Sequence, residues 1–197
     1  ADSDTWQKTA EACPWATYFH SPAWADFIVA VFPEFTREAL GCTLEDGTVA
    51  VLPAVVRRKR RLLGTAKEYK SMEPGVYGGF IAGRELTGPE TGQLAQAVLK
   101  LKGAAGRIVE TPWQPLHLPK PFIAKQLETH VVELKADFEL LQKAFSRGQK
   151  SNLNQARRKE VSIRKAATPQ DVDAYYTLYE ESIRRWGQTA GAVYPRD

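Results

Sequence analysis

Two strand-like runs joined through Asp46-Gly47 constrain the fold of this chain most strongly. Residues 36–44 (TREALGCTL) and 48–57 (TVAVLPAVVR) both favour extended backbone. Asp-Gly between two such runs is a strong signal for a tight hairpin turn. The sequence therefore predicts an antiparallel hairpin over residues 36–57. Because Pro53 has no N–H group, we expect an edge, a bulge or a break in the pairing near it.

A helix is predicted to begin at Ser21. Serine is a favoured N-cap residue, and Pro22 would occupy the first helical position. The apolar residues that follow recur at helical spacing and predict one buried face: Trp24, Phe27, Ile28 and Val31. Pro33 is expected to end this helix.

A second helix start lies at Thr168-Pro169, where Asp171 completes the pattern of a capping box. The apolar residues after it also recur at helical spacing: Val172, Tyr175, Tyr176, Tyr179, Ile183 and Trp186. Gly187 is expected to end this amphipathic helix. A helix of this kind needs a surface to pack against, so we expect that the chain is truncated.

Weaker patterns fill the rest of the chain. They predict helices over residues 89–101 and from Asp137 into the basic segment that follows it. They also predict strands over residues 107–111, 129–134 and 161–166. Helices interleaved with strands, together with an antiparallel hairpin, predict an α/β or α+β fold with a mixed sheet.

Length and composition set broad limits. The 197 residues, 43% of them hydrophobic, suffice for one large domain or for one domain and part of another. No apolar run approaches the roughly 18 residues of a transmembrane helix, and the polar N-terminus does not resemble a signal peptide. Cys13 and Cys42 have no metal-ligand spacing, so we expect two buried free thiols in a cytoplasmic protein.

Positive charge is concentrated between Lys143 and Lys165. This segment has eight Lys or Arg residues and one carboxylate, Glu160, which gives a formal charge of +7 in a chain of +4. Four of its polar side chains would share one broad helix face: Lys150, Asn154, Arg157 and Arg158. Such a face can contact several phosphate oxygens together. The pattern predicts a phosphate-bearing donor or precursor, or tRNA, as partner.

A second basic run extends from Arg57 to Arg61, and it is either a solvated strand end or another phosphate contact. The sequence from Arg61 to Ala66 (RLLGTA) also matches the loop that holds the pyrophosphate of coenzyme A. Pro74-Gly75 interrupts the helix that such a loop requires, so we interpret the match as the end of a basic hairpin. The three histidines share no motif, and no metal site is predicted.

Glu110 follows Ile108 and Val109 at the end of an apolar strand. A carboxylate at a strand end over a cleft can accept a proton from an attacking amine. The alternative is a surface glutamate paired with a nearby lysine.

Three motifs resemble the Fem-type aminoacyl or peptidyl transferases and their acetyltransferase-like bacterial relatives. Residues 19–24 (FHSPAW) resemble the motif of the opening helix. Tyr77-Gly78-Gly79 is similar to an aromatic-Gly-Gly loop, and residues 150–161 (KSNLNQARRKEV) are similar to the basic helix of that group. The resemblance implies two tandem GNAT-like domains, with the first over residues 1–135 and the beginning of the second over residues 136–197.

The resemblance also implies an activity, the formation of an amide by transfer of an acyl or aminoacyl group onto an amine. The donor would be acyl-coenzyme A or aminoacyl-tRNA, and the setting would be cell-envelope or exopolysaccharide biosynthesis. Tyr77, Gly78 and Gly79 would shape the acceptor site. Lys150, Arg157 and Arg158 would contact phosphates, and Glu110 would be the base.

Three departures weigh against the muropeptide precursor as substrate. Ile28 stands where a lysine is common in the Fem branch, Asn154-Gln155 replaces an Arg-Lys pair, and Glu160 stands where glycine is usual. Two other functions therefore stay open: a non-enzymatic RNA-binding or anion-binding module with a GNAT-like fold, and a degenerate fold that serves only in protein assembly.

Overall fold

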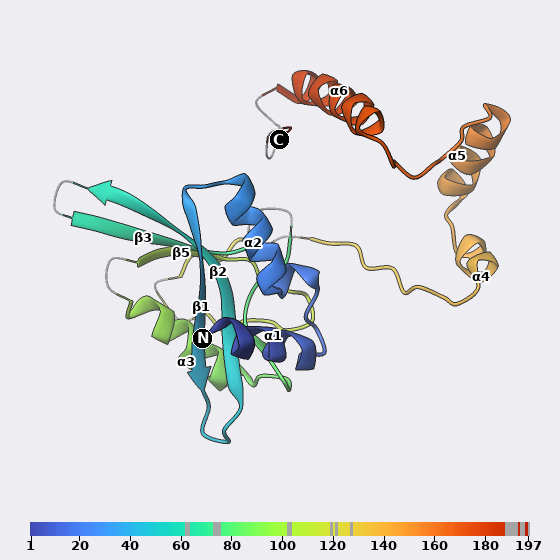
Figure 1. Ribbon diagram of the computed structural model, residues 1–197. Coiled ribbons are helices and arrows are strands. Elements are labelled where there is room, and N and C mark those ends of the chain that lie inside the picture. Colours follow the sequence, from blue (N-terminus) through green and yellow to red (C-terminus); the bar gives the residue numbers. More distant parts are fainter. Residues whose placement is uncertain are drawn as a thin grey trace. The chain divides into compact units, whose positions relative to one another are not determined.

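The computed structural model of the chain describes residues 1–61, 64–72, 76–101, 104–118, 120, 122–126, 128–187, 193 and 196. Within these residues the fold is mixed α+β, with six α-helices and a mixed sheet of five strands (Figure 1). The chain divides into two compact units, chiefly residues 1–124 and residues 125–188.

The sheet begins with the predicted hairpin. Strands β1 (Phe35–Thr43) and β2 (Val49–Arg61) pair antiparallel through their full common length. The turn between them closes when the N–H of Leu44 donates to the carbonyl of Thr48 at 2.8 Å. Gly47 has a φ of 84°, which glycine adopts at little steric cost.

Three more strands complete the sheet. Strand β3 (Gly64–Ser71) pairs antiparallel with β2, and β5 (Ala104–Ile108) pairs parallel with β3. The short strand β4 (Ile81–Ala82) pairs with β2. The order is β1-β2-β3-β5, and the parallel pair is the part of the sheet that carries the candidate site.

Pro53 lies in the middle of β2, opposite Ala39. The carbonyl of Ala39 accepts a hydrogen bond from the chain's first residue, so it points away from β2, and the backbone groups of Pro53 point away from β1. On the side of β2 that faces away from β1, the neighbouring strand changes. Strand β4 pairs with Ala50 and Val51, and β3 pairs with β2 from Val55 onward. The expected break near Pro53 is confirmed.

Helices lie on both faces of the sheet. Helices α1 (Ser3–Ala12) and α2 (Pro22–Val31) contact β2, and α2 also contacts β1. Helix α3 (Gly88–Leu99) lies on the other face. Leu101, which follows this helix, packs against the side chains of β2 that point to that face. Residues 50–56 of β2 are almost fully buried. This explains why that stretch reads as a continuous apolar run and not as an alternating one.

Helix α2 begins as predicted, since the Ser21 side chain accepts the N–H of Trp24 at 3.3 Å. Its buried face differs from the predicted one. Ala25 and Ile28 are buried, whereas Phe27 is 46% exposed and stacks on Trp24 with ring centroids 5.1 Å apart. Ile28 is thus buried as predicted, whereas Ala25 and not Phe27 lies on the buried face with it.

The second unit contains helices α4 (Phe138–Lys143), α5 (Arg147–Arg158) and α6 (Pro169–Trp186). The predicted capping box of α6 is confirmed, with Thr168 and Asp171 bonded reciprocally. The prediction of one continuous helix from Asp137 was wrong, because Ser146 caps a new helix.

Other boundaries also differ from the prediction. Residues 129–134 and 161–166 are not strands. The strand expected over residues 107–111 lies at Ala104–Ile108 instead. Among the described residues, no helix combines the length and the apolar character that crossing a bilayer requires.

Candidate functional site

The carboxyl ends of β3 and β5 meet at the loop Tyr77-Gly78-Gly79. The N–H of Gly78 donates to the carbonyl of Val109, just after β5, at 2.8 Å. The N–H of Gly79 donates to the Oγ of Ser71, the last residue of β3, at 2.7 Å. In open sheets, ligands bind outside the carboxyl ends of parallel strands. The loop therefore lies where a binding crevice is expected.

Both glycines of this loop are required by their surroundings. A Cβ atom on Gly78 would lie 2.2 Å from the carbonyl oxygen of Ser71, which is far inside van der Waals contact. Gly79 has a φ of 94°, a backbone conformation that other residues rarely adopt. Close approach explains the first glycine, and backbone conformation explains the second.

His20 holds the same loop from its other side. Its side chain is fully buried, and its Nδ1 accepts the N–H of Thr17 at 3.0 Å. The proton of the neutral ring therefore lies on Nε2, which donates to the carbonyl of Gly78 at 3.0 Å. Burial lowers the pKa of His20, so the ring stays neutral. The sequence placed His20 in a helix-start motif but gave no sign of this contact across 58 residues.

Glu110 adjoins the loop, since a Cβ on Gly79 would lie 3.6 Å from its Cα. Its Oε2 accepts the N–H of Leu116 at 2.8 Å, which orders the segment after β5. Among the described residues, its Oε1 has no hydrogen-bond partner and no lysine pairs with it. One lone-pair-bearing oxygen is thus left to accept a proton.

Trp113 is a site residue that the sequence did not identify. Its ring meets that of Tyr77 edge to face, with centroids 5.8 Å apart, and 48% of the residue is exposed. The segment that carries it is anchored by buried Gln114, which bonds both the N–H and the carbonyl of Leu86 at 2.9 Å. In the sequence, the signal that points to Trp113 is its place in a proline-rich connector, three residues after Glu110.

The predicted basic face lies on α5, in the other unit. Positions 150, 154, 157 and 158 share one side of the helix. The Nζ of Lys150 donates to the carbonyl of Lys143 at the end of α4, at 2.9 Å. Arg157 and Arg158 are exposed, and neither forms an ion pair with another described residue. Two guanidinium groups on α5 are therefore left for an anionic partner.

The structure brings four of the predicted site residues together in the first unit: Tyr77, Gly78, Gly79 and Glu110. It groups the other four on α5 in the second unit: Lys150, Asn154, Arg157 and Arg158. Asn154 also lines a hollow between α4 and α5.

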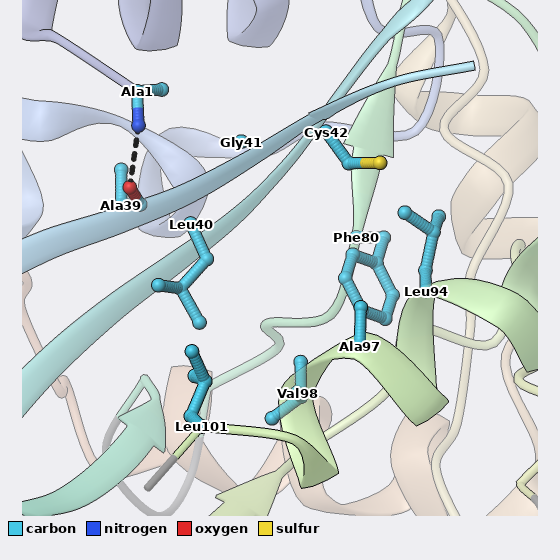
Figure 2. Close-up of a pocket in the computed structure, with 10 residues that line it drawn as sticks. All are labelled: Ala1, Ala39, Leu40, Gly41, Cys42, Phe80, Leu94, Ala97, Val98 and Leu101. Atoms are coloured by element: carbon cyan, nitrogen blue, oxygen red, sulfur yellow. Dashed lines mark hydrogen bonds between the residues drawn. The ribbon is translucent and has the colours of Figure 1, made fainter.

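An apolar groove of about 320 Å³ lies between β1 and α3 (Figure 2). Leu40 of β1 faces Leu101, and Phe80, the residue after Gly79, lies beside Leu94. The thiol of Cys42 points into this groove and is exposed, so the expectation of two buried cysteines was wrong for Cys42. Cys42 lies in β1, an outer strand of the sheet.

The described part of the chain holds no group of three or more His, Cys, Asp or Glu residues placed to bind a metal ion.

In comparisons with known proteins, no family model, no curated protein and no solved structure matches this chain.

Proposed function

We propose that this protein is an acyl or aminoacyl transferase of GNAT-like fold that forms an amide on an amine acceptor. A role in cell-envelope or exopolysaccharide biosynthesis follows from the resemblance of its motifs. The observation that carries the proposal is the loop Tyr77-Gly78-Gly79, which is bonded to the carboxyl ends of β3 and β5 with Glu110 beside it.

Glu110 supplies the proton acceptor for this reaction. An acceptor ammonium group must lose a proton before its nitrogen can attack, and the free Oε1 of Glu110 is the group at the loop that can take it. The nitrogen lone pair then attacks the ester or thioester carbonyl of the donor. Collapse of the tetrahedral intermediate breaks the carbon–oxygen or carbon–sulfur bond, and the leaving group takes up the second proton, which the nitrogen loses as the amide forms.

The two loop amides are not the donors that stabilise the oxyanion. The N–H groups of Gly78 and Gly79 already donate to Val109 and Ser71. Their bonds fix the loop instead, and with it the Tyr77 ring and its edge contact with Trp113. The contribution of this loop is therefore positioning, which lowers the entropic part of the barrier.

Helix α5 supplies the phosphate contacts. Arg157 and Arg158 present fork-shaped donors suited to phosphate oxygens, and Asn154 adds an amide on the same face. Acyl-coenzyme A and aminoacyl-tRNA both carry such phosphates, so both donor classes fit the helix.

A transfer assay tests the proposal. Acyl-coenzyme A and aminoacyl-tRNA are supplied in separate arms with a panel of primary amines, and amide product is measured by mass spectrometry. We expect product in one arm, with kcat lowered about 100-fold or more by Glu110→Gln. Glu128→Gln, at an exposed carboxylate outside the site, is the matched control. Donor affinity that is unchanged by Arg157→Ala with Arg158→Ala would refute the phosphate assignment.

The second candidate is a non-enzymatic RNA-binding or anion-binding module. The observation in its favour is the pair of exposed arginines on α5 that lack an acidic partner among the described residues. It predicts binding of tRNA-sized RNA whose log–log salt dependence has a slope of several units, on the order of one per phosphate contact. It also predicts no amide product in either arm.

A further inference from the structure

Small side chains leave the groove between β1 and α3 open. Leu40 and Cys42 of β1 line one wall, and Ala97 and Val98 of α3 line the other (Figure 2). Packed elements normally interdigitate without a gap of about 320 Å³, because atoms that face a gap lose their van der Waals contacts. A larger side chain in place of Ala97 would fill this space. The groove is therefore large enough for a small ligand.

The lining of the groove suits a hydrocarbon. None of the described residues that line it has a nitrogen or an oxygen in its side chain. A protein partner would need about one hydrogen bond per 100–200 Å² of interface, and these side chains offer none of that kind. The thiol of Cys42 is only a weak donor. An alkyl chain, in contrast, gains free energy from each methylene that it buries.

A charged cluster lies beyond the Leu40 end of the groove. Glu38 precedes Leu40 by two residues on β1, so the two side chains share a face of the sheet. The hydroxyl of Tyr69 donates to the Oε1 of Glu38 at 3.0 Å, and the Nζ of Lys67 donates to the Oε2 of the same carboxylate at 3.2 Å. Tyr69 also belongs to the cluster against which Leu40 packs. Apolar and charged surfaces are therefore continuous here.

Arg58 gives this end of the groove an excess of one positive charge. It lies opposite Lys67 in the register of β2 and β3, so both side chains project from the face that carries the groove. Glu38 neutralises Lys67, whereas Arg58 is exposed and forms no ion pair with another described residue. An anionic group at this end would thus meet a guanidinium that has no carboxylate partner.

The length of the groove limits the ligand. Leu94 and Phe80 stand beside Cys42 at one end, and Leu40 faces Leu101 at the other. Glu38 and Cys42 are four residues apart on β1, which corresponds to about 14 Å along a strand. Because carbon–carbon bonds are about 1.5 Å long and zigzag, roughly eleven carbons of an extended chain cover that distance.

We propose that the groove binds a medium-chain fatty carboxylate, with its alkyl chain between β1 and α3 and its carboxylate toward Lys67 and Arg58. The binding uses neither the Tyr77-Gly78-Gly79 loop nor α5, so it is independent of the transferase function. An amine with the same alkyl chain shares the apolar contacts but is repelled by the excess positive charge.

Protection of Cys42 from a maleimide tests the binding. Cys42 is exposed, whereas Cys13 is buried and burial raises the pKa of its thiol, so brief labelling should modify Cys42 first. Hexanoate, octanoate and decanoate are each added below the concentration at which they form micelles. We expect slower labelling, with an affinity that rises about two- to fourfold per added methylene. Decylamine should bind about fivefold more weakly than decanoate.

Ala97→Trp and Gln96→Trp are a matched pair on α3. Both positions are exposed, and of the two it is Ala97 that lines the groove. Ala97→Trp should fill the groove and lower the affinity for decanoate about 10-fold or more, and Gln96→Trp should leave it unchanged. Calorimetric titration measures the affinities, and circular dichroism checks that each variant is folded. Equal losses in the two variants, or labelling that no carboxylate slows, would overturn the proposal.

Arg58→Gln and Arg107→Gln test the charged end. Arg107 of β5 is exposed and aligns with Lys70, which alternates with Tyr69, so it lies on the opposite face of the sheet. Arg58→Gln should weaken decanoate binding about two- to fivefold, and Arg107→Gln should not. Equal affinity of the unaltered chain for decanoate and decylamine would refute the anionic ligand. Labelling of Cys42 that slows with protein concentration alone would assign the groove to a second copy of this chain instead.

Discussion

The Tyr77-Gly78-Gly79 loop and helix α5 are the two regions for which the sequence predicted substrate contacts, and they use their polar groups in opposite ways. In the loop, the Gly78 and Gly79 amides and the Gly78 carbonyl are bonded to Val109, Ser71 and His20. On α5, Arg157 and Arg158 have no ionic partner among the described residues. The loop is suited to hold a geometry, and the helix is suited to attract a charge.

The largest expected effect concerns the first glycine of the loop. Gly78→Ala would place a Cβ 2.2 Å from a backbone oxygen that cannot move alone, and we expect a loss of about 3 kcal/mol or more in the free energy of unfolding. Urea denaturation measures it. Gly148→Ala in α5 is the opposite case, because its new methyl would meet only the Oγ of Ser146, at an ordinary contact distance of 4.0 Å, and in a helix should stabilise by about 0.5–1 kcal/mol. Equal effects at the two positions would remove the contrast between loop and helix.

The next effect is a dependence on pH that belongs to the loop alone. Burial holds the pKa of His20 below its ordinary value of 6.5, so above that pH the ring is neutral in both folded and unfolded chains. As the pH falls below 6.5, the unfolded chain takes up the proton first. The free energy of unfolding should then fall by up to about 1.4 kcal/mol per pH unit.

Urea denaturation of the wild-type chain between pH 7 and pH 5 measures this slope. His20→Gln keeps a donor for the Gly78 carbonyl but cannot titrate, so its slope should be flatter. His130→Gln, at an exposed histidine, should leave the slope unchanged. Asp46 and Glu90 have pKa values of about 2, below their ordinary values of 3.8 and 4.5, so the stability that they contribute is lost mainly below pH 5, outside this range. A slope that survives in His20→Gln would assign the effect elsewhere.

A smaller effect is expected at the cap of α5. The Oγ of Ser146 accepts the N–H of Gln149 at 3.2 Å, and Ser146→Ala should destabilise the helix by about 1 kcal/mol. The helical signal in circular dichroism, followed as the protein is warmed, measures this loss of stability. The intrinsic fluorescence of the tryptophans in the first unit should report an unchanged transition for that unit; a joint shift would mean that the two units unfold together.

The smallest effect on stability is expected for the arginines themselves. Arg157→Ala with Arg158→Ala removes no ion pair between described residues, so the free energy of unfolding should change by less than about 0.5 kcal/mol. Affinity for a phosphate-rich probe such as coenzyme A should fall clearly in a fluorescence titration. Marked destabilisation with unchanged affinity would assign these arginines to the fold and not to a ligand.

Features specified by neighbouring residues were predictable from the sequence. The Asp46-Gly47 turn, the Ser21 cap and the Thr168–Asp171 capping box each depend on contacts within four residues. Ser146 and Gln149 form the same kind of box, and this signal was present but was overlooked inside an apparently continuous helix. Residues 129–134 have the composition of a strand, but strand formation depends on a pairing partner more than on intrinsic preference.

The candidate site was predictable only in its residue types. The motif Tyr77-Gly78-Gly79 was predicted, but Gly78 is required by a close approach to Ser71 and Gly79 by its positive φ, and no local pattern encodes either. His20 acts across 58 residues, and Trp113 acts through a ring contact with Tyr77. Contacts of this range arise from the order of the strands, which a single sequence does not display.

The parallel pairing of β3 with β5 has a consequence for how the site assembles. The strands β1, β2 and β3 are consecutive antiparallel neighbours, and their closeness in the sequence lets them meet early in folding. Strand β5 reaches β3 only after α3 has been placed, and closure of such a long connection is slow. Since Gly78 is bonded to the residue that follows β5, we expect the loop to be the last part of the first unit to form. Its amides should also be among the first to exchange with solvent in the native protein.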